Sequence, residues 1–157
     1  MSVISLAELK LQLSPGQRLL GLDLGEKTIG LALSDTMATI ATPMETLPRG
    51  KFSNDAAKIL SLISEHNIGA LIIGLPLNMD GSEGPSVQSA RAFARNFAAK
   101  SDIAIVFQDE RLSTAAVTRT LLEADSSRAK RARVVDKMAA AYILQIALDR
   151  LRALPPA

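Results

Sequence analysis

The chain has 157 residues, 48% of them apolar, a formal net charge of +2 and no cysteine. This length is typical of one domain with a single core, and the lack of cysteine excludes disulfides, thiolate catalysis and cysteine-ligated zinc. The longest apolar run, about eight residues around Ile68–Leu75, is too short for the roughly 20 residues of a membrane span. Residues 1–13 contain Glu8 and Lys10 and lack the long apolar core of a secretion signal, so we expect a cytoplasmic protein.

The N-terminal part of the chain predicts a short segment followed by a β-hairpin. Residues 1–17 are expected to form an appended segment with a short amphipathic helix over Leu6–Leu13. Two apolar runs, Arg18–Leu24 and Thr28–Ser34, are joined by a turn that starts at Gly25, which predicts a pair of antiparallel strands. We therefore divide the chain into an N-terminal extension, a central domain and a C-terminal tail, over residues 1–17, 18–152 and 153–157.

The rest of the chain alternates between strand and helix signals. Thr39–Leu47 predicts a weaker third strand, and Pro43 places it at a sheet edge or a bulge. The later elements are expected to be a helix over Asn54–Glu65, a buried strand over Ala70–Gly74, a helix that opens at Pro85, a buried strand over Ile103–Phe107, a helix from Ser113 to Glu123 and a final helix over Val134–Leu151. This order predicts an α/β fold in which a mixed sheet begins with an antiparallel hairpin, continues with parallel strands and carries helices on both faces.

Three acidic residues fall at comparable places in this order. Asp23 lies near the end of the first strand, Glu110 follows the last predicted strand, and Asp136 lies in the first turn of the final helix. Ligands of α/β sheets bind at the carboxyl ends of strands, and the small residues at 139–141 would let the final helix bring Asp136 towards Asp23. Hard cations prefer oxygen ligands. The three carboxylates therefore predict a catalytic site that holds Mg²⁺ or Mn²⁺ and hydrolyses phosphodiester bonds.

Each carboxylate also has an ordinary structural explanation. Asp23 could accept hydrogen bonds from amides of the turn. Glu110 could pair with Arg111, and Asp136 could be favoured by the positive end of its helix. Their joint placement at one edge of the sheet favours the metal site.

Polar and basic residues around this edge predict contacts with a polyanion. The loop Asn78–Gly84 follows a buried strand, a position where loops often contact ligands. Five Lys or Arg residues occur within 128–137, a distribution that suits a nucleic acid. One Tyr, four Phe and no Trp are too few aromatic residues for a base-stacking platform. The residues expected to contact the phosphate backbone of the substrate are Lys27, Asn78, Ser82, Arg111, Arg131 and Arg133.

Four motifs, in chain order, resemble the bacterial family called YqgF or RuvX. They are GLDLGEKTIGLALSD at 21–35, IGLPLNMDGS at 73–82, DERLST at 109–114, and VD at 135–136 with the later AA and ILQ of the same predicted helix. The matches run from about Arg18 to Asp149, so the resemblance covers nearly the whole domain. Members are described as Holliday-junction resolvase-like proteins and as pre-16S rRNA nucleases.

The resemblance implies an RNase H-like fold and a metal-dependent nuclease that trims the 5′ end of precursor 16S rRNA during ribosome biogenesis. The acidic positions of the family fall on Asp23, Glu110 and Asp136. The implied partners are pre-16S rRNA, the pre-30S ribosomal particle and four-way DNA junctions, with no membrane. A monomer or a homodimer is expected.

Three other functions stay open on the sequence alone. A resolvase would use the same site on four-way DNA junctions. A structured-RNA-binding protein would keep the carboxylates for a structural ion. A phosphotransferase is suggested by the hairpin, which resembles the phosphate loop of actin, sugar kinases and chaperone ATPases, but those proteins close two such domains around ATP and this chain has the length of one.

Overall fold

The computed structural model describes residues 3–78, 80–109 and 128–155, and in the last range it describes side chains from residue 137 onwards. The strands are β1 (Arg18–Leu24), β2 (Thr28–Ser34), β3 (Ala41–Pro48), β4 (Ile68–Leu75) and β5 (Ala104–Asp109). The helices of these ranges are α1 (Leu6–Gln12), α2 (Phe52–His66), α3 (Pro85–Ala98) and α5 (Arg128–Ala153).

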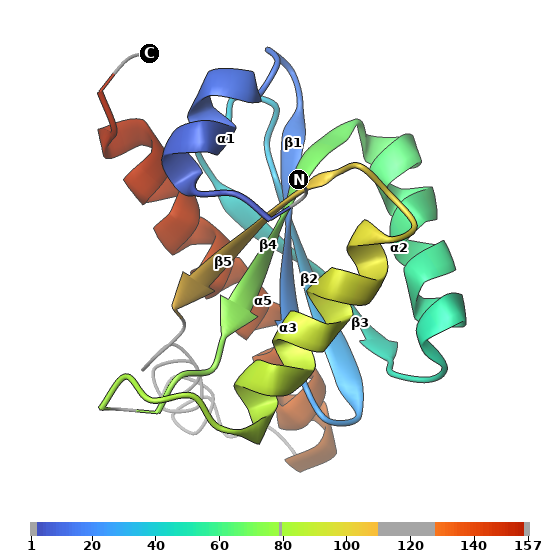
Figure 1. Ribbon diagram of the computed structural model, residues 1–157. Helices are drawn as coiled ribbons and strands as arrows, with labels where there is room; N and C mark the ends of the chain where they lie inside the picture. The colour runs from blue at the N-terminus through green and yellow to red at the C-terminus, as the bar shows by residue number, and fades with distance from the viewer. Residues whose placement is uncertain (1–2, 79, 110–127, 156–157) are drawn as a thin grey trace.

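The strands form one mixed sheet in the order β3-β2-β1-β4-β5 (Figure 1). β1 pairs antiparallel with β2, and β2 pairs antiparallel with β3. On its other side β1 pairs in parallel with β4, which pairs in parallel with β5. The predicted α/β fold, with a hairpin start followed by parallel strands, is therefore confirmed, and β1 is its central strand.

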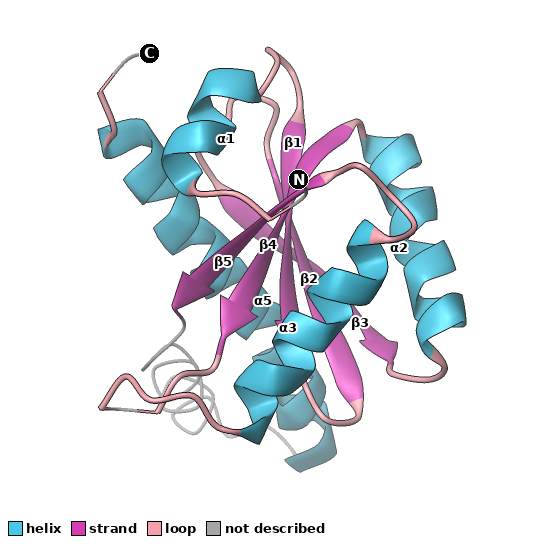
Figure 2. Cartoon of the chain, viewed as in Figure 1, coloured by secondary structure: helices cyan, strands magenta, loops and turns pink. Residues whose placement is uncertain are grey.

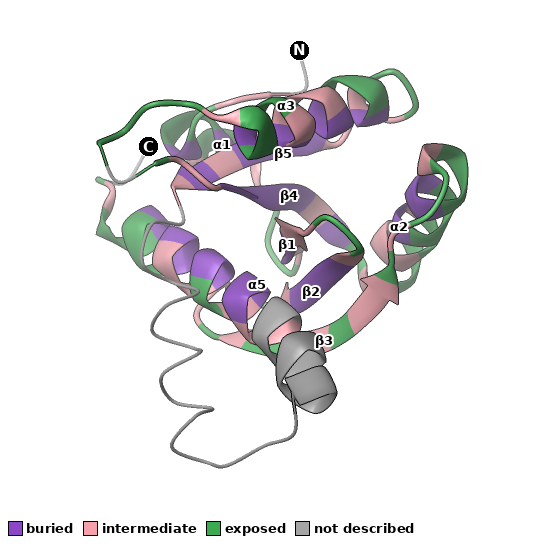
Figure 3. Cartoon of the chain, turned by 90° about the horizontal axis from the view of Figure 1, so that it is seen from below, coloured by how far each residue is buried: buried purple, intermediate pink, exposed green. Residues whose placement is uncertain are grey.

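Helices cover both faces of this sheet (Figure 2). Successive side chains of a strand point to opposite faces, so Leu20 and Leu22 of β1 pack with α2 and α3, whereas Leu19 packs with α1 and α5. Figure 3 shows that the buried parts of these helices are turned towards the sheet. None of the helices, as far as the structure describes them, has the length and apolar character that a membrane crossing requires.

The sheet and α5 approach each other closely at Gly21. A Cβ built on this glycine would lie 2.9 Å from the carbonyl oxygen of Ala140 and 2.9 Å from Cβ of Leu144. Such distances are too short for a real side chain, so a larger residue would push the helix away from β1. The close approach expected from the small residues at 139–141 is confirmed, and it sets the position of α5 over the centre of the sheet.

The N-terminal segment is part of this packed structure. Leu6 and Leu9 of α1 are buried in the same apolar cluster as α5. Val3 forms a parallel bridge with Ile105 of β5. Lys10 donates hydrogen bonds to two carbonyl oxygens at the C-terminal end of α5, a place where a cation is favoured by the helix dipole. The segment thus fixes the C-terminal end of α5 against the sheet.

The main difference from the predicted elements concerns the last helix. The sequence predicts a helix over Val134–Leu151, whereas α5 already begins at Arg128. The intervening residues are Ala, Arg and Lys, which are strong helix formers, so the basic stretch extends the helix. The other described elements agree with the predicted ranges to within two residues at either end. The helix expected over Ser113–Glu123 lies outside the described residues.

Candidate functional site

Three strands end at the same edge of the sheet, which we call the carboxyl edge. β1 ends at Leu24, β4 at Leu75 and β5 at Asp109, and the three strands run in parallel (Figure 1). Asp23 is half-buried and lies one residue before the end of β1. Because open α/β sheets bind ligands outside the carboxyl ends of their strands, this edge is the candidate functional site.

The direction of α5 follows from two contacts along its length. Ala140 lies against Gly21 in the middle of β1. Further along the helix, Gln145 accepts a hydrogen bond from the backbone N–H of Ala41 at 2.8 Å. Ala41 pairs with Ser34 at the far end of the β1–β2 hairpin. Over β2 and β3 the C-terminal half of α5 therefore lies at the end of the hairpin opposite the carboxyl edge, and the N-terminal half extends towards that edge, while Arg150 of the same helix reaches Gln108 on β5.

This direction extends the turn of α5 that contains Asp136 towards the edge at which Asp23 lies. Asp23 is two residues beyond Gly21, on the same face of the sheet and about 6.6 Å further along the strand. Asp136 is four residues before Ala140, about 6 Å back along α5. The Gly21–Ala140 contact is thus compatible with the predicted pairing of the two aspartates, which stays a prediction. Only the backbone of Asp136 is described.

The turn after Asp23 is held from outside by Arg49. The N–H of Gly25 donates to the carbonyl oxygen of Thr28 at 2.8 Å, and a Cβ on Gly25 would lie 2.9 Å from that oxygen. The Arg49 guanidinium donates to the carbonyl oxygen of Gly25 at 2.6 Å, and the Arg49 backbone N–H donates to that of Lys27 at 2.8 Å. Lys27 itself is exposed, which a contact with a phosphate requires.

The loop after β4 is closed by its own polar side chains. Asn78 Nδ2 donates to Ser82 Oγ at 2.9 Å, and Ser82 Oγ donates to Asp80 Oδ1 at 2.6 Å. Gly81 adopts a positive φ of 88° that favours glycine. The two residues predicted to contact phosphate, Asn78 and Ser82, are thus exposed at the carboxyl edge and hydrogen-bonded to each other.

An ion pair fixes the end of this loop on α3. Arg91 donates from Nε and Nη2 to the carboxylate of Glu83 at 3.0 and 2.8 Å. These hydrogen bonds hold the pKa of Glu83 below its ordinary value and raise the pKa of Arg91. The guanidinium also lies 5.3 Å from the centroid of the Phe107 ring on β5. The loop, α3 and β5 are therefore connected close to the carboxyl edge.

The end of β5 is anchored by a buried glutamine. Gln108 Nε2 donates to the carbonyl oxygen of Asp109 at 3.1 Å, and Gln108 Oε1 accepts from Arg150 of α5 at 2.7 Å. The predicted carboxylate Glu110 and the predicted contact Arg111 follow directly and lie outside the described residues. The residue before Glu110, Asp109, is therefore held in place at the carboxyl edge.

The predicted basic contacts belong to the first turns of α5. Arg131 and Arg133 precede Asp136 within the helix, in the half that lies towards the carboxyl edge. Their backbone is helical, and their side chains lie outside the described part of the chain. The helix therefore carries these two residues and Asp136 as one rigid element.

The donor chemistry of the carboxyl edge fits a hard divalent cation. Asp23 and Asp136 carry carboxylate oxygens, and Glu110 follows the end of β5; such ligands suit Mg²⁺ or Mn²⁺. Among the side chains that the structure describes, no three His, Asp or Glu residues are grouped to hold a metal ion. That set contains only one of the three predicted ligands, Asp23.

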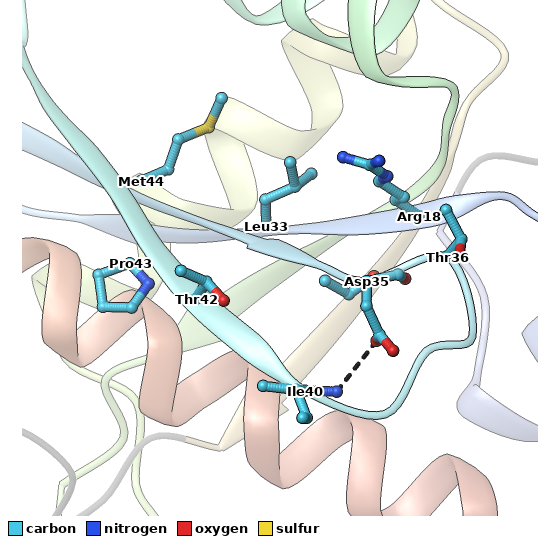
Figure 4. Close-up of a pocket in the computed structure, with 9 residues that line it drawn as sticks. Arg18, Leu33, Asp35, Thr36, Ile40, Thr42, Pro43 and Met44 are labelled. Atoms are coloured by element: carbon cyan, nitrogen blue, oxygen red, sulfur yellow. Dashed lines mark hydrogen bonds between the residues drawn. The ribbon is translucent and has the colours of Figure 1, made fainter.

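A second polar site lies at the other end of the β1–β2 hairpin. A cavity of about 530 Å³ there is lined by residues that include Arg18, Asp35 and Met44 (Figure 4). The Asp35 carboxylate accepts hydrogen bonds from the Thr39 hydroxyl at 2.5 Å and from the backbone N–H groups of Thr39 and Ile40 at 2.6 and 3.0 Å. These hydrogen bonds lower the pKa of Asp35 from 3.8 to about 2, and the bond from the Thr39 hydroxyl contributes most. We therefore assign this carboxylate to the stability of its loop.

Three anchoring residues of the carboxyl edge are absent from the sequence predictions. Arg49 and Arg91 are single arginines in surface segments without a motif, so nothing in the sequence singles them out. Gln108 offered a usable signal, because it is a polar residue that ends the apolar run of 104–107. All three form hydrogen bonds that hold the backbone or a neighbouring side chain in place around the predicted site.

Sequence comparisons identify one family. The family model described as "RuvX: Holliday junction resolvase" matches residues 17–150. A protein of Methylocella silvestris is 61% identical over 150 residues, which cover 96% of this chain and 93% of the relative. A protein of Paramagnetospirillum magneticum is 61% identical over 149 residues, which cover 95% of this chain and 96% of the relative. Both relatives are named "Putative pre-16S rRNA nuclease".

Solved structures share the fold at much lower sequence identity. RuvC of T. thermophilus in complex with Holliday junction substrate gives a TM-score of 0.52 at 14% identity, over 90% of this chain and 99% of that chain. Fowlpox virus resolvase in complex with substrate Holliday junction DNA gives a TM-score of 0.52 at 11% identity, over 86% and 99%. At these identities the similarity shows the fold alone, and this fold is that of the RNase H-like resolvases.

Proposed function

The chain belongs to the RuvX family, and we propose that it is a metal-dependent endonuclease that processes the 5′ end of precursor 16S rRNA during ribosome biogenesis. The names of its relatives support a hydrolase that acts on nucleic acid. The proposal adds the metal, the reaction and the substrate. It also places the protein in the cytoplasm, on RNA that is part of a pre-30S particle, as a monomer or homodimer.

The observation that carries the proposal is the contact between Gly21 and Ala140. It lets α5 lie directly against β1, and we expect it to bring the turn of Asp136 towards Asp23. The two residues come from elements more than 100 residues apart in the chain. A cation between two such carboxylates would offset their mutual repulsion, which is the role that the proposal gives to the metal.

The residues of this chain divide the work between holding the metal and holding the substrate. Asp23, Glu110 and Asp136 would hold the metal ions. When bound, Mg²⁺ or Mn²⁺ activates water and stabilises charge on the leaving oxygen in phosphodiester hydrolysis. Lys27 extends from an anchored turn beside Asp23, where its ammonium would bind a phosphate of the backbone.

A second group of residues would position the nucleic acid along the carboxyl edge. Asn78 and Ser82 offer an amide and a hydroxyl from the loop after β4. Arg111 would add a guanidinium after Glu110. Arg131 and Arg133 would bind phosphates further along the strand, with a grip that weakens as salt rises because bound counterions are released.

The choice between RNA and DNA is the finer part of the proposal. The relatives at about 60% identity are named for pre-16S rRNA, which favours RNA. The family model is described as a Holliday junction resolvase, so cleavage of four-way DNA junctions is the second candidate function. Both substrates would use the same carboxylates and differ in the contacts made by the surrounding basic residues.

A side-by-side cleavage assay tests the proposal. The full-length protein would be given a 5′-extended 16S rRNA precursor, a single-stranded DNA and a four-way DNA junction, each with Mg²⁺, with Mn²⁺ and with EDTA. We expect metal-dependent cleavage of the RNA precursor and much weaker cleavage of the two DNAs. Junction cleavage alone would move the function to recombination. Tight RNA binding without any cleavage, in the presence of either metal, would contradict the nuclease.

A further inference from the structure

Arg49 makes three hydrogen bonds that connect two separate parts of the carboxyl edge. Its guanidinium donates from Nη1 to the carbonyl oxygen of Gly25 at 2.6 Å and from Nη2 to the hydroxyl of Ser89 on α3 at 3.2 Å. Its backbone N–H donates to the carbonyl oxygen of Lys27 at 2.8 Å. Arg49 thus binds both sides of the β1–β2 turn and joins the turn to α3.

The turn itself is short and its tip faces solvent. Gly25 bonds to Thr28 across the turn at 2.8 Å, and Glu26 and Lys27 at its tip are exposed. Two carbonyl groups of a tight turn point outwards and need donors from elsewhere. A guanidinium can satisfy acceptors in two directions at once because its donors form a rigid, planar fork. Arg49 is therefore suited to fix the turn in one orientation.

The turn and α3 both carry residues that the proposed function uses. Asp23 lies two residues before Gly25, so a shift of the turn would move the carboxylate that holds the metal. Lys27 lies between the two carbonyl groups that Arg49 binds. On the other side, Ser89 belongs to the second turn of α3, directly after the loop of Asn78 and Ser82. The bridge sets the distance between these two groups of residues.

We propose that Arg49 is a positioning residue of this site: it holds the turn of Asp23 and Lys27 against α3 so that metal ligand and phosphate contacts keep their productive arrangement. The inference rests on the proposed nuclease function. Residues that orient metal ligands typically change activity or metal affinity by about 10–100-fold when they are replaced. We expect an effect of this size on the rate of cleavage.

The test uses Arg49→Lys and Arg49→Met, with Arg95→Met as the matched control. Arg95 is an exposed arginine near the C-terminal end of α3, the helix that contains Ser89. In cleavage of the RNA precursor, Arg49→Met should lower kcat by about 10–100-fold and raise the Mg²⁺ concentration needed for half-maximal rate, with KM little changed. Arg49→Lys should recover part of this loss, because a lysine keeps the positive charge but lacks the planar fork that points donors at Gly25 and Ser89 together. Arg95→Met should behave as wild type.

A second measurement does not depend on activity. Hydrogen exchange of the Gly25 amide reports opening of the turn, and it should become about tenfold faster in Arg49→Lys, as expected for the loss of one supporting hydrogen bond. Unchanged exchange in this variant would overturn the proposal. If wild type cleaves nothing, the proposed function fails, and the exchange rates still decide whether Arg49 holds the turn.

A direct contact between Arg49 and the substrate gives a different pattern. In that case Arg49→Met would raise KM at constant kcat, leave the Gly25 amide as protected as in wild type, and flatten the salt dependence of RNA binding by about one phosphate contact. That pattern would overturn the positioning role. Ser89→Ala, which removes only the bond to α3, should give a smaller loss of kcat, and its effect should not add to that of Arg49→Met.

Discussion

The two ends of the β1–β2 hairpin each carry an aspartate, and they use it differently. At the far end, three donors of its own loop bind the Asp35 carboxylate and lower its pKa to about 2. At the carboxyl edge, the turn after Asp23 is held through its backbone carbonyl groups by Arg49. An anchor on the backbone fixes a turn through its carbonyl groups, whereas an anchor on a carboxylate fixes a loop through that side chain. The two ends of the hairpin therefore keep their shape by different means, and of these two turns only the one held by Arg49 lies at the carboxyl edge.

The largest expected effect separates these two aspartates by activity. Asp23→Asn should lower the rate of metal-dependent RNA cleavage by about a thousandfold or more, because metal-stabilised charge contributes several kcal/mol to the transition state. Asp35→Asn is the matched control on the same hairpin and should keep nearly full activity at 25 °C. Cleavage rates would be measured on variants with native circular dichroism. An equal loss of cleavage rate in both variants would show that the two ends of the hairpin do not differ in function.

The contact that joins the carboxyl edge to α5 gives the next largest effect. In Gly21→Ala the added Cβ would meet the Ala140 carbonyl oxygen at 2.9 Å, so α5 must shift, at a cost of about 1–3 kcal/mol in the free energy of unfolding. Cleavage should fall as well, because Asp136 moves with the helix. Gly50→Ala is the control, since its Cβ would lie 4.0 Å from the nearest atom. Denaturant unfolding with unchanged stability in Gly21→Ala would show that the close approach is not required.

The far end of the hairpin is tested by stability. Asp35→Ala should lower the free energy of unfolding at pH 7 by about 2 kcal/mol, the range for hydrogen bonds to a charged group. The pKa of Asp35 is about 2 in the folded protein and 3.8 ordinarily, so its contribution is fully present above pH 3.8 and is lost as pH falls towards 2. Unfolding curves of wild type and variant should therefore converge below this range. A difference of the same size well below pH 2 would contradict the contribution of the charge.

The smallest expected effect concerns the basic residues beside the carboxyl edge. Replacing Arg131 and Arg133 together by Ala should weaken RNA binding and reduce the slope of log K against log salt by about 0.7 for each lost contact to a single strand. Lys58, exposed on α2, is the control position. Binding would be measured by fluorescence anisotropy between low and moderate salt. An unchanged slope would exclude the first turns of α5 from the substrate path.

The sequence predicts those parts of the molecule that have a repeating or local signal. Alternating and continuous apolar runs predict the five strands, with the antiparallel strands first and the parallel strands after them. The alanines at 139–141 predict the close approach of α5. The start of α5 at Arg128 was missed because a stretch of basic residues is compatible with either a loop or a helix. The high helix propensity of Ala, Arg and Lys favours the helix. Arg49, Arg91 and Gln108 act through contacts between segments distant in the chain, and no local pattern contains such contacts.

For the site, the sequence predicts where the carboxylates belong but not what holds them. The structure shows the close approach of α5 to β1 at Gly21 and Ala140, and the pairing of Asp23 with Asp136 stays a prediction. Asn78 and Ser82 lie at the same edge, and their mutual hydrogen bond was not predicted because it depends on the conformation of a single loop. The predictions for Glu110 and Arg111, which lie outside the described residues, stay predictions.

We expect Asp23, and not Asp35, to belong to a divalent cation site. The most direct measurement is Mn²⁺ binding by electron paramagnetic resonance, on wild type, Asp23→Asn and Asp35→Asn in the absence of nucleic acid. We expect bound Mn²⁺ in wild type and in Asp35→Asn, with affinity at least tenfold weaker in Asp23→Asn, within the range for disturbed metal sites of about 10–100-fold. Equal Mn²⁺ affinity in wild type and Asp23→Asn would contradict a metal site at Asp23.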